Sequence, residues 1–238
     1  RQKQLDIVAD VIEAILEGRM SPMEFDFIVA GQGESDLERR FIALANDPRR
    51  LSVGMSFVFL QGYIQDMAFA MFSSIDNKVV PSHFEPCGLA QMQALRYGAV
   101  PIVSYTGGLG DTVHEGGVKP NGFTFPIRSR NDVPVTEEEI RIDNDARNYN
   151  AWELKEAIGR ALGVYYDHAD VWQHIIENGM MENNDWSRSI HEYIQHFFFS
   201  SGLGWPFMPM PTMFELENFS WFACAFTWPG MSSIKDTN

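Results

Sequence analysis

Residues 81–113 of the chain read PSHFEPCGLAQMQALRYGAVPIVSYTGGLGDTV. An apolar strand end, Val79-Val80, leads into a Pro-Ser turn, then to an acidic residue at 85 and a helix that begins near Gly88. A second short strand, AVPIV, ends at a Gly-Gly loop. This order of strand, loop, helix, strand and loop is typical of open α/β sheets, which bind ligands outside the carboxyl ends of their strands.

The loops at these expected strand ends carry groups suited to phosphates and sugars. The helix near Gly88 has unpaired backbone N–H groups and a partial positive charge at its first turn, where a phosphate or a sugar hydroxyl can dock. Gly88 also lets a ligand approach the backbone closely. Glu85, just ahead of the helix, can accept hydrogen bonds from hydroxyls or stabilise developing positive charge. Short glycine motifs also occur by chance, so the residues alone equally fit an ordinary helix with an acidic residue at its start.

Strands and helices are expected to alternate along most of the chain. Apolar residues at helical spacing predict a helix over 5–16, which Gly18 ends. The other expected strands are 25–30, 56–61, 78–80 and 122–126, and the other expected helices are 35–46, 66–74, 151–166, 171–181 and 186–199. Short strands separated by such helices indicate βαβ units and a parallel sheet. The rest of the polar stretch 115–150 is expected to be a solvated loop.

The composition favours one acidic domain with a full core. The chain has 238 residues, of which 45% are hydrophobic, and a formal net charge of −14. Such a charge argues against binding to nucleic acid or to an anionic membrane, and no apolar run is long enough for a membrane span. Only Cys87 and Cys224 are cysteines, so we expect a reducing compartment, the bacterial cytoplasm or the plastid stroma. Because the chain starts without Met, in helical periodicity, we interpret it as the back part of a longer protein.

The runs EPCGL, ALRYG, PIV and TGGLGDTV resemble the C-terminal nucleotide-sugar domain of bacterial glycogen synthases and plant starch synthases. The resemblance is dense in residues 81–113 and extends more weakly from Gln2 to about Phe197. It implies an α/β fold in which helices flank a Rossmann-like parallel sheet, as in the C-terminal half of a two-domain GT-B fold. We expect residues 1–199 to form this domain without its first strand. Residues 200–238, rich in Trp, Phe, Met and Pro, are expected to be an extension of unknown role.

The resemblance implies that Glu85 and Lys3 are the catalytic residues. The pair Gln2-Lys3 matches a Gln-Lys pair of the family, in which the lysine and an arginine five residues before it hold the diphosphate. That arginine would precede residue 1. Gln4 stands where the family has glycine. Taken without the resemblance, Lys3 is most simply a solvated lysine at the start of a helix.

The resemblance also implies a donor-binding set. It comprises Tyr63, Cys87, Gly88, Leu89, Gln93, Thr106, Gly107 and Gly108. Tyr63 would lie against the nucleotide base, and packing at a strand end is the alternative. Gln93 lies eight residues after Glu85, where many retaining glycosyltransferases have a second Glu, and its amide can hydrogen-bond a hydroxyl. His83 occupies a position where the family commonly has arginine.

The implied activity is that of a retaining glucosyltransferase of the starch or glycogen synthase type. Glucose would pass from ADP-glucose or UDP-glucose to the non-reducing end of an α-1,4-glucan, with no metal or other cofactor. The expected partners are the nucleotide sugar, the glucan acceptor and an N-terminal GT-B domain, without which the fragment should be inactive. Gln4 and His83 leave open a non-catalytic nucleotide- or glucan-binding relative of the same fold. The EPCGL and TGGL runs speak against a third alternative, a sucrose- or trehalose-forming transferase.

Overall fold

The computed structural model describes residues 2–19, 25–53, 55–62, 65–130 and 134–184, together with residues 190 and 193. The chain divides into two units, Arg1–Glu182 and Asn183–Asn238. All elements described below belong to the first unit. The expected helix 186–199 falls almost wholly outside the described residues, and the extension 200–238 and Tyr63 lie outside them.

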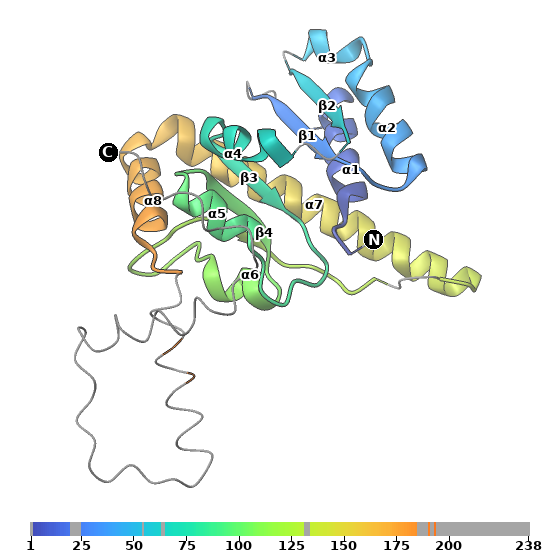
Figure 1. Ribbon diagram of the computed structural model, residues 1–238. Coiled ribbons are helices and arrows are strands. Elements are labelled where there is room, and N and C mark those ends of the chain that lie inside the picture. The colour runs from blue at the N-terminus through green and yellow to red at the C-terminus, as the bar shows by residue number, and fades with distance from the viewer. Residues whose placement is uncertain are drawn as a thin grey trace, which may run out of the picture. The chain divides into compact units, whose positions relative to one another are not determined.

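All described strand pairs are parallel, and they form two sheets (Figure 1). One sheet pairs β1 (Phe27–Gly31) with β2 (Phe57–Gln61). The other has the order β3 (Asn77–Val80), β4 (Val100–Ser104), β5 (Phe123–Phe125). All five residues of β4 are buried, as expected for the central strand of a parallel sheet covered on both faces. The predicted α/β class with parallel strands is confirmed.

The described helices flank these strands and mostly lie where periodicity predicts them. They are α1 (Leu5–Leu16), α2 (Ser35–Ala45), α3 (Arg49–Ser52), α4 (Gln65–Ser74), α5 (Ala90–Arg96), α6 (Gly107–Thr112), α7 (Glu137–Asp167) and α8 (Ala169–Met181). Two of them are additions to the prediction. The single turn α3 was not expected, and α6 folds on the residues expected to form the Gly-Gly loop after β4.

The largest correction concerns residues 137–150, which are helical and not a loop. The helix α7 begins with a capping box, in which the Thr136 hydroxyl accepts from the Glu139 N–H and the Glu139 carboxylate accepts from the Thr136 N–H. Three glutamates in its first turn also suit the positive end of the helix dipole. The prediction failed because this half of α7 buries polar side chains, Asp143 and Asn150, where a helical pattern of apolar residues is normally sought.

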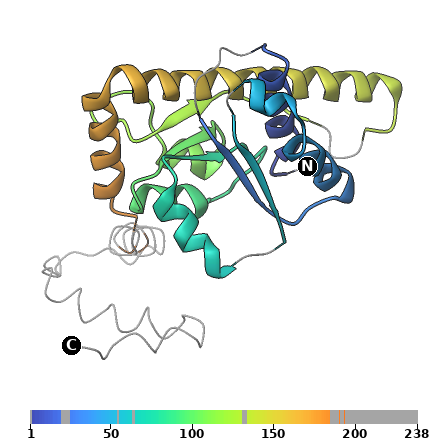
Figure 2. The same ribbon diagram turned by 90° about the horizontal axis from the view of Figure 1, so that it is seen from above.

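One hydrophobic core joins the helices to both sheets. It includes Ile12 of α1, Phe57 of β2, Ile102 of β4 and Leu154 of α7, each at most 2% exposed. Burying one such side chain stabilises the fold by about 1.5–3 kcal/mol. The helix α7 contacts α1, β4 and β5, and Figure 2 shows it as one continuous helix along the side of this unit. It therefore links the N-terminal segment to the three-stranded sheet.

Candidate active site

The loops that follow β3 and β4 cross in direct backbone contact. The N–H of Gly108 donates to the carbonyl oxygen of Glu85 across 2.9 Å. A Cβ at Gly107 would lie 2.4 Å from that same oxygen, and one at Gly108 would lie 2.1 Å from the carbonyl oxygen of Cys87. Gly107 also has a φ of +43°, in the left-handed region that favours glycine. The two glycines are therefore needed for the crossing itself.

Two serines connect the ends of β3 and β4 through hydrogen bonds. Ser104, the last residue of β4, donates from Oγ to the carbonyl oxygen of Ser82 across 2.5 Å. Ser82 in turn donates from Oγ to Oε2 of Glu85 across 3.0 Å. Both serines are fully buried, so Ser104 holds the backbone of Ser82 and the Ser82 hydroxyl orients the Glu85 carboxylate from inside the fold. The sequence reasoning passed over them, although serines next to the ends of two neighbouring strands were a usable signal.

The structure brings Lys3 and Glu85 together from positions that are 82 residues apart in the chain. The Lys3 ammonium donates to Oε2 of Glu85. The backbone strengthens this contact, since the His83 N–H donates to the Gln2 carbonyl oxygen across 2.7 Å and the Gln2 amide donates to the Phe84 carbonyl oxygen across 3.1 Å. The N-terminal residues therefore lie along the loop that carries Glu85.

The charge state of this pair follows from its geometry. The hydrogen bond from Lys3 holds the pKa of Glu85 below its usual value against the effect of burial, and the bond from Ser82 acts in the same direction as Lys3. The Glu85 side chain is 13% exposed and the Lys3 side chain is 58% exposed. An ionised carboxylate thus lies mostly inside the edge of the sheet, and a positive charge lies outside it.

A buried glutamine links the two loops through hydrogen bonds. It was not singled out from the sequence. Gln91 is fully buried in α5 and donates from Nε2 to the carbonyl oxygen of Cys87 and to Oγ1 of Thr112, each across 3.1 Å. Thr112 donates onward to the Gly108 carbonyl oxygen across 2.6 Å. The amide of Gln91 lies where a Cβ of Gly88 would be, at 2.4 Å. The glycine at 88, with a φ of +76°, therefore also makes room for this amide.

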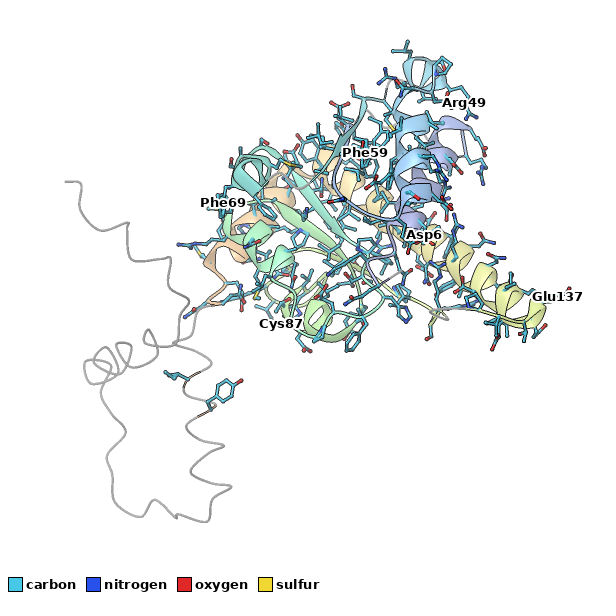
Figure 3. All side chains as sticks on the ribbon, turned by 45° about the vertical axis from the view of Figure 1, so that its right-hand side comes forward. Asp6, Arg49, Phe59, Phe69, Cys87 and Glu137 are labelled. Atoms are coloured by element: carbon cyan, nitrogen blue, oxygen red, sulfur yellow. The ribbon has the colours of Figure 1, made fainter. Side chains whose placement is uncertain are left out.

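The other predicted site residues differ in their exposure to solvent. Exposed positions are Cys87, Leu89, Gln93 and Gly107, Thr106 is half-buried as the N-cap residue of α6, and Gly88 and Gly108 are buried. Figure 3 labels Cys87, which is a free thiol on the loop after β3. Tyr63 lies outside the described residues, so its contact with a base stays a prediction.

A separate hollow of about 610 Å³ lies between α1 and α7, away from the crossing loops. Its lining includes Glu13, Asn148, Trp152 and Lys155, and none of its lining residues belongs to the run 81–113. Within the described ranges, no three metal-ligating side chains are gathered into a cluster that could hold a metal ion. In the same part of the chain, no helix combines the length and the apolar character needed to cross a bilayer.

Comparisons with known proteins confirm the resemblance to glycogen and starch synthases. The glycogen synthase of Thermosipho africanus is 32% identical over 198 residues, which cover 82% of this chain and 34% of that protein. The glycogen synthase of Desulfitobacterium hafniense is 34% identical over 200 residues, which cover 81% of this chain and 35% of that protein. The chain thus spans about a third of the length of the curated relatives that it matches.

A solved structure and a family model complete the comparison. The catalytic domain of starch synthase IV from Arabidopsis thaliana, bound to ADP and acarbose, matches with a TM-score of 0.60 and 26% identity, over 84% of this chain and 36% of that chain. This likeness confirms the fold class expected from the resemblance, half of a GT-B fold. Residues 1–134 match the family model described as glycosyl transferases group 1. Because that match covers more than half of the 238 residues, the chain belongs to the group 1 glycosyltransferases.

Proposed function

We propose that this chain is the donor-binding part of a glucosyltransferase that extends α-1,4-glucans. Glucose would come from ADP-glucose or UDP-glucose and would keep its anomeric configuration. The observation that carries the proposal is the meeting of Lys3 and Glu85 beside the Gly107-Gly108 crossing, because it joins a cation, an ionised carboxylate and a close backbone turn at the strand ends. The similarity to glycogen synthases supports the choice of donor and acceptor.

In the proposed reaction, the bond between the anomeric carbon and the diphosphate oxygen breaks and a bond to the acceptor oxygen forms on the same face of the sugar. The Lys3 ammonium, which is largely exposed, would pair with the diphosphate as it gains negative charge. The ionised Glu85 would stabilise positive charge on the sugar ring. The proton of the acceptor hydroxyl would leave with the nucleoside diphosphate. An N-terminal domain would supply the contacts with the acceptor.

The second candidate is a non-catalytic relative that binds a nucleotide or a glucan. Gln4 and His83, where the resembled family has glycine and arginine, favour it. The exposed thiol of Cys87 would suit a reducing compartment, the bacterial cytoplasm or the plastid stroma, in either case. Neither candidate needs a metal ion.

The full-length protein tests the choice. It would be incubated with glycogen, EDTA and either ADP-glucose or UDP-glucose carrying a radiolabelled glucose. We expect label to enter the glycogen from one of the donors and to be released by an enzyme that cleaves only α-1,4 bonds from the non-reducing end. Nucleotide binding without any incorporation of label from either donor would favour the non-catalytic candidate.

The isolated chain gives a second test by calorimetric titration. We expect weak binding of ADP or UDP and no transfer, since the arginine of the family and the acceptor-binding domain are outside this chain. Loss of one charge-assisted contact to a diphosphate costs about 1.5–3 kcal/mol. Sub-micromolar affinity or turnover by this chain alone would show that the bounds assigned to the functional unit are wrong.

A further inference from the structure

Gln4 has a backbone conformation that glutamine rarely adopts. Its φ is +44° and its ψ is +38°, and among the described residues it is the one non-glycine residue with a positive φ. It stands between Lys3 and the first residue of α1, at the place where the resembled family has glycine. The side chain is 1% exposed. Since a left-handed backbone favours glycine, a buried glutamine here needs contacts that hold it.

One such contact comes from Asn150, which lies 146 residues further along the chain and is fully buried in α7. Its Nδ2 donates to Oε1 of Gln4 across 3.0 Å. The same amide is fixed on the other side by Arg128, because Nδ2 donates to the Arg128 carbonyl oxygen across 3.1 Å and Oδ1 accepts from the Arg128 N–H across 2.7 Å. Arg128 therefore holds the amide of Asn150 in place, and this amide in turn holds the side chain of Gln4.

Ion pairs strengthen the same junction within the first turn of α1. Arg130 donates to Asp6 across 2.7 Å and to Asp143 of α7 across 3.0 Å. The Arg130 side chain is only 10% exposed. Asp6, labelled in Figure 3, thus fixes the start of α1 to the N-terminal half of α7. Residue 4 lies between this anchor and the ion pair of Lys3 with Glu85.

We propose that Gln4 and Asn150 are positioning residues that hold Lys3 against Glu85. The reason is mechanical: the long Lys3 side chain is mostly exposed, so its direction depends on the backbone on both sides, at Gln2, which is bonded to the loop of Glu85, and at Gln4. Glycine at this position would be free to rotate, whereas Gln4 is fixed through its side chain. The role of Lys3 in binding a diphosphate rests on the proposed function, but its positioning does not. On this view Gln4 replaces glycine without disabling the site, which removes one motive for the non-catalytic candidate.

The test uses ADP titration of full-length protein with Asn150→Ala and Gln4→Gly. The second variant is the milder one, because Asn150 keeps both of its bonds to Arg128 when the Gln4 side chain is absent. We expect each variant to weaken ADP binding about three- to tenfold, and to have no further effect when Lys3 is already alanine. The matched control is Asn148→Ala, since Asn148 is exposed on the same helix and should leave the affinity unchanged. Losses of affinity that add fully to that of Lys3→Ala would overturn the proposal.

A second measurement does not depend on the nucleotide. Brief acetylation, followed by mass spectrometry of the peptides, compares the reactivity of Lys3 with that of exposed Lys119 in the same sample. We expect Gln4→Gly and Asn150→Ala to raise the reactivity of Lys3 relative to Lys119, and Asn148→Ala to leave it unchanged. Unchanged reactivity in folded variants would show that the amide pair serves stability alone. If the wild type binds neither ADP nor UDP, the proposed function fails, and the acetylation result still decides the positioning.

Discussion

The backbone N–H of Gly108 donates to the carbonyl oxygen of Glu85, and this bond fixes the loop after β4 to the loop after β3. The acidic residue of the candidate site is therefore held by its own main chain as well as by Lys3 and Ser82. Three separate parts of the sequence converge on this one residue. A substitution in any of these three parts should affect the Glu85 carboxylate, although each part acts through a different kind of contact.

Gly108→Ala should destabilise the domain by about 1–3 kcal/mol, the usual cost of inserting a methyl group into a packed interior. The new Cβ would meet the backbone carbonyl oxygen of Cys87 at 2.1 Å, which a side-chain rotation cannot relieve. The measurement is urea unfolding followed by circular dichroism. Gly116→Ala is the control, because a Cβ there meets nothing within 4 Å. Equal midpoints for the two variants would contradict the tight crossing.

If the proposed function is right, Glu85→Gln should leave the fold intact and reduce glucosyl transfer by the full-length protein at least about a hundredfold, since it removes the charge proposed to stabilise the transition state. The amide can still accept the hydrogen bonds from Lys3 and Ser82, so the geometry should be retained. Initial rates at saturating donor concentration would measure the effect. A near-normal rate would remove Glu85 from the mechanism.

The same substitution should change the dependence of stability on pH. The pKa of Glu85 in the folded protein lies below its ordinary value of 4.5, chiefly through the bond from Lys3. A carboxyl group with a lowered pKa stabilises the fold above its unfolded pKa and loses this contribution as the pH falls through the folded value. We therefore expect the difference in unfolding free energy between wild type and Glu85→Gln to be constant near neutral pH and to shrink below about pH 4.5. A difference that stays constant down to pH 2 would refute the lowered pKa.

Thr136→Ala should shorten α7 at its start and cost about 0.5–2 kcal/mol, the usual effect of removing an N-cap side chain. The hydroxyl of Thr136 accepts from the Glu139 N–H across 3.1 Å, and its loss opens the capping box. Helix content by circular dichroism and the unfolding midpoint would both fall. Glu137→Ala is the matched control in the same turn, since the capping box does not use its side chain. An equal effect of the two variants would mean that the capping bond contributes no more than one glutamate at the positive end of the helix dipole.

The fold of residues 77–106 could be predicted from the sequence because every signal there is local, whereas the helix α6 that follows was expected to be a loop. Two short apolar runs end at Pro81 and at Ser104, and glycines mark the turns that follow. The sequence marks Gly108 as part of a glycine turn, but it does not show why glycine is needed there. A close approach of two backbones depends on the paired strands that carry them, and no neighbouring residue reveals it.

The features that escaped prediction outside this range depend on long-range contacts. The first half of α7 looks like a polar loop, since its buried positions include the polar residues Asp143 and Asn150. Their partners are Arg130 and Gln4, and only the folded chain brings them into contact. Gln91 was missed for a similar reason, as its amide is buried among carbonyl and hydroxyl groups of two loops.

The contact between Gln4 and Asn150 also bears on the order in which the domain folds. Closing a loop of 146 residues costs conformational entropy before any contact offsets this cost, so such contacts form late. A ribosome must also have released residue 150 before α7 can meet the start of α1. The strands β3 and β4 and their glycine crossing can assemble earlier, from residues that lie close together in the chain. During synthesis, the backbone around Glu85 can therefore reach its final form before the contact between Gln4 and Asn150 is made.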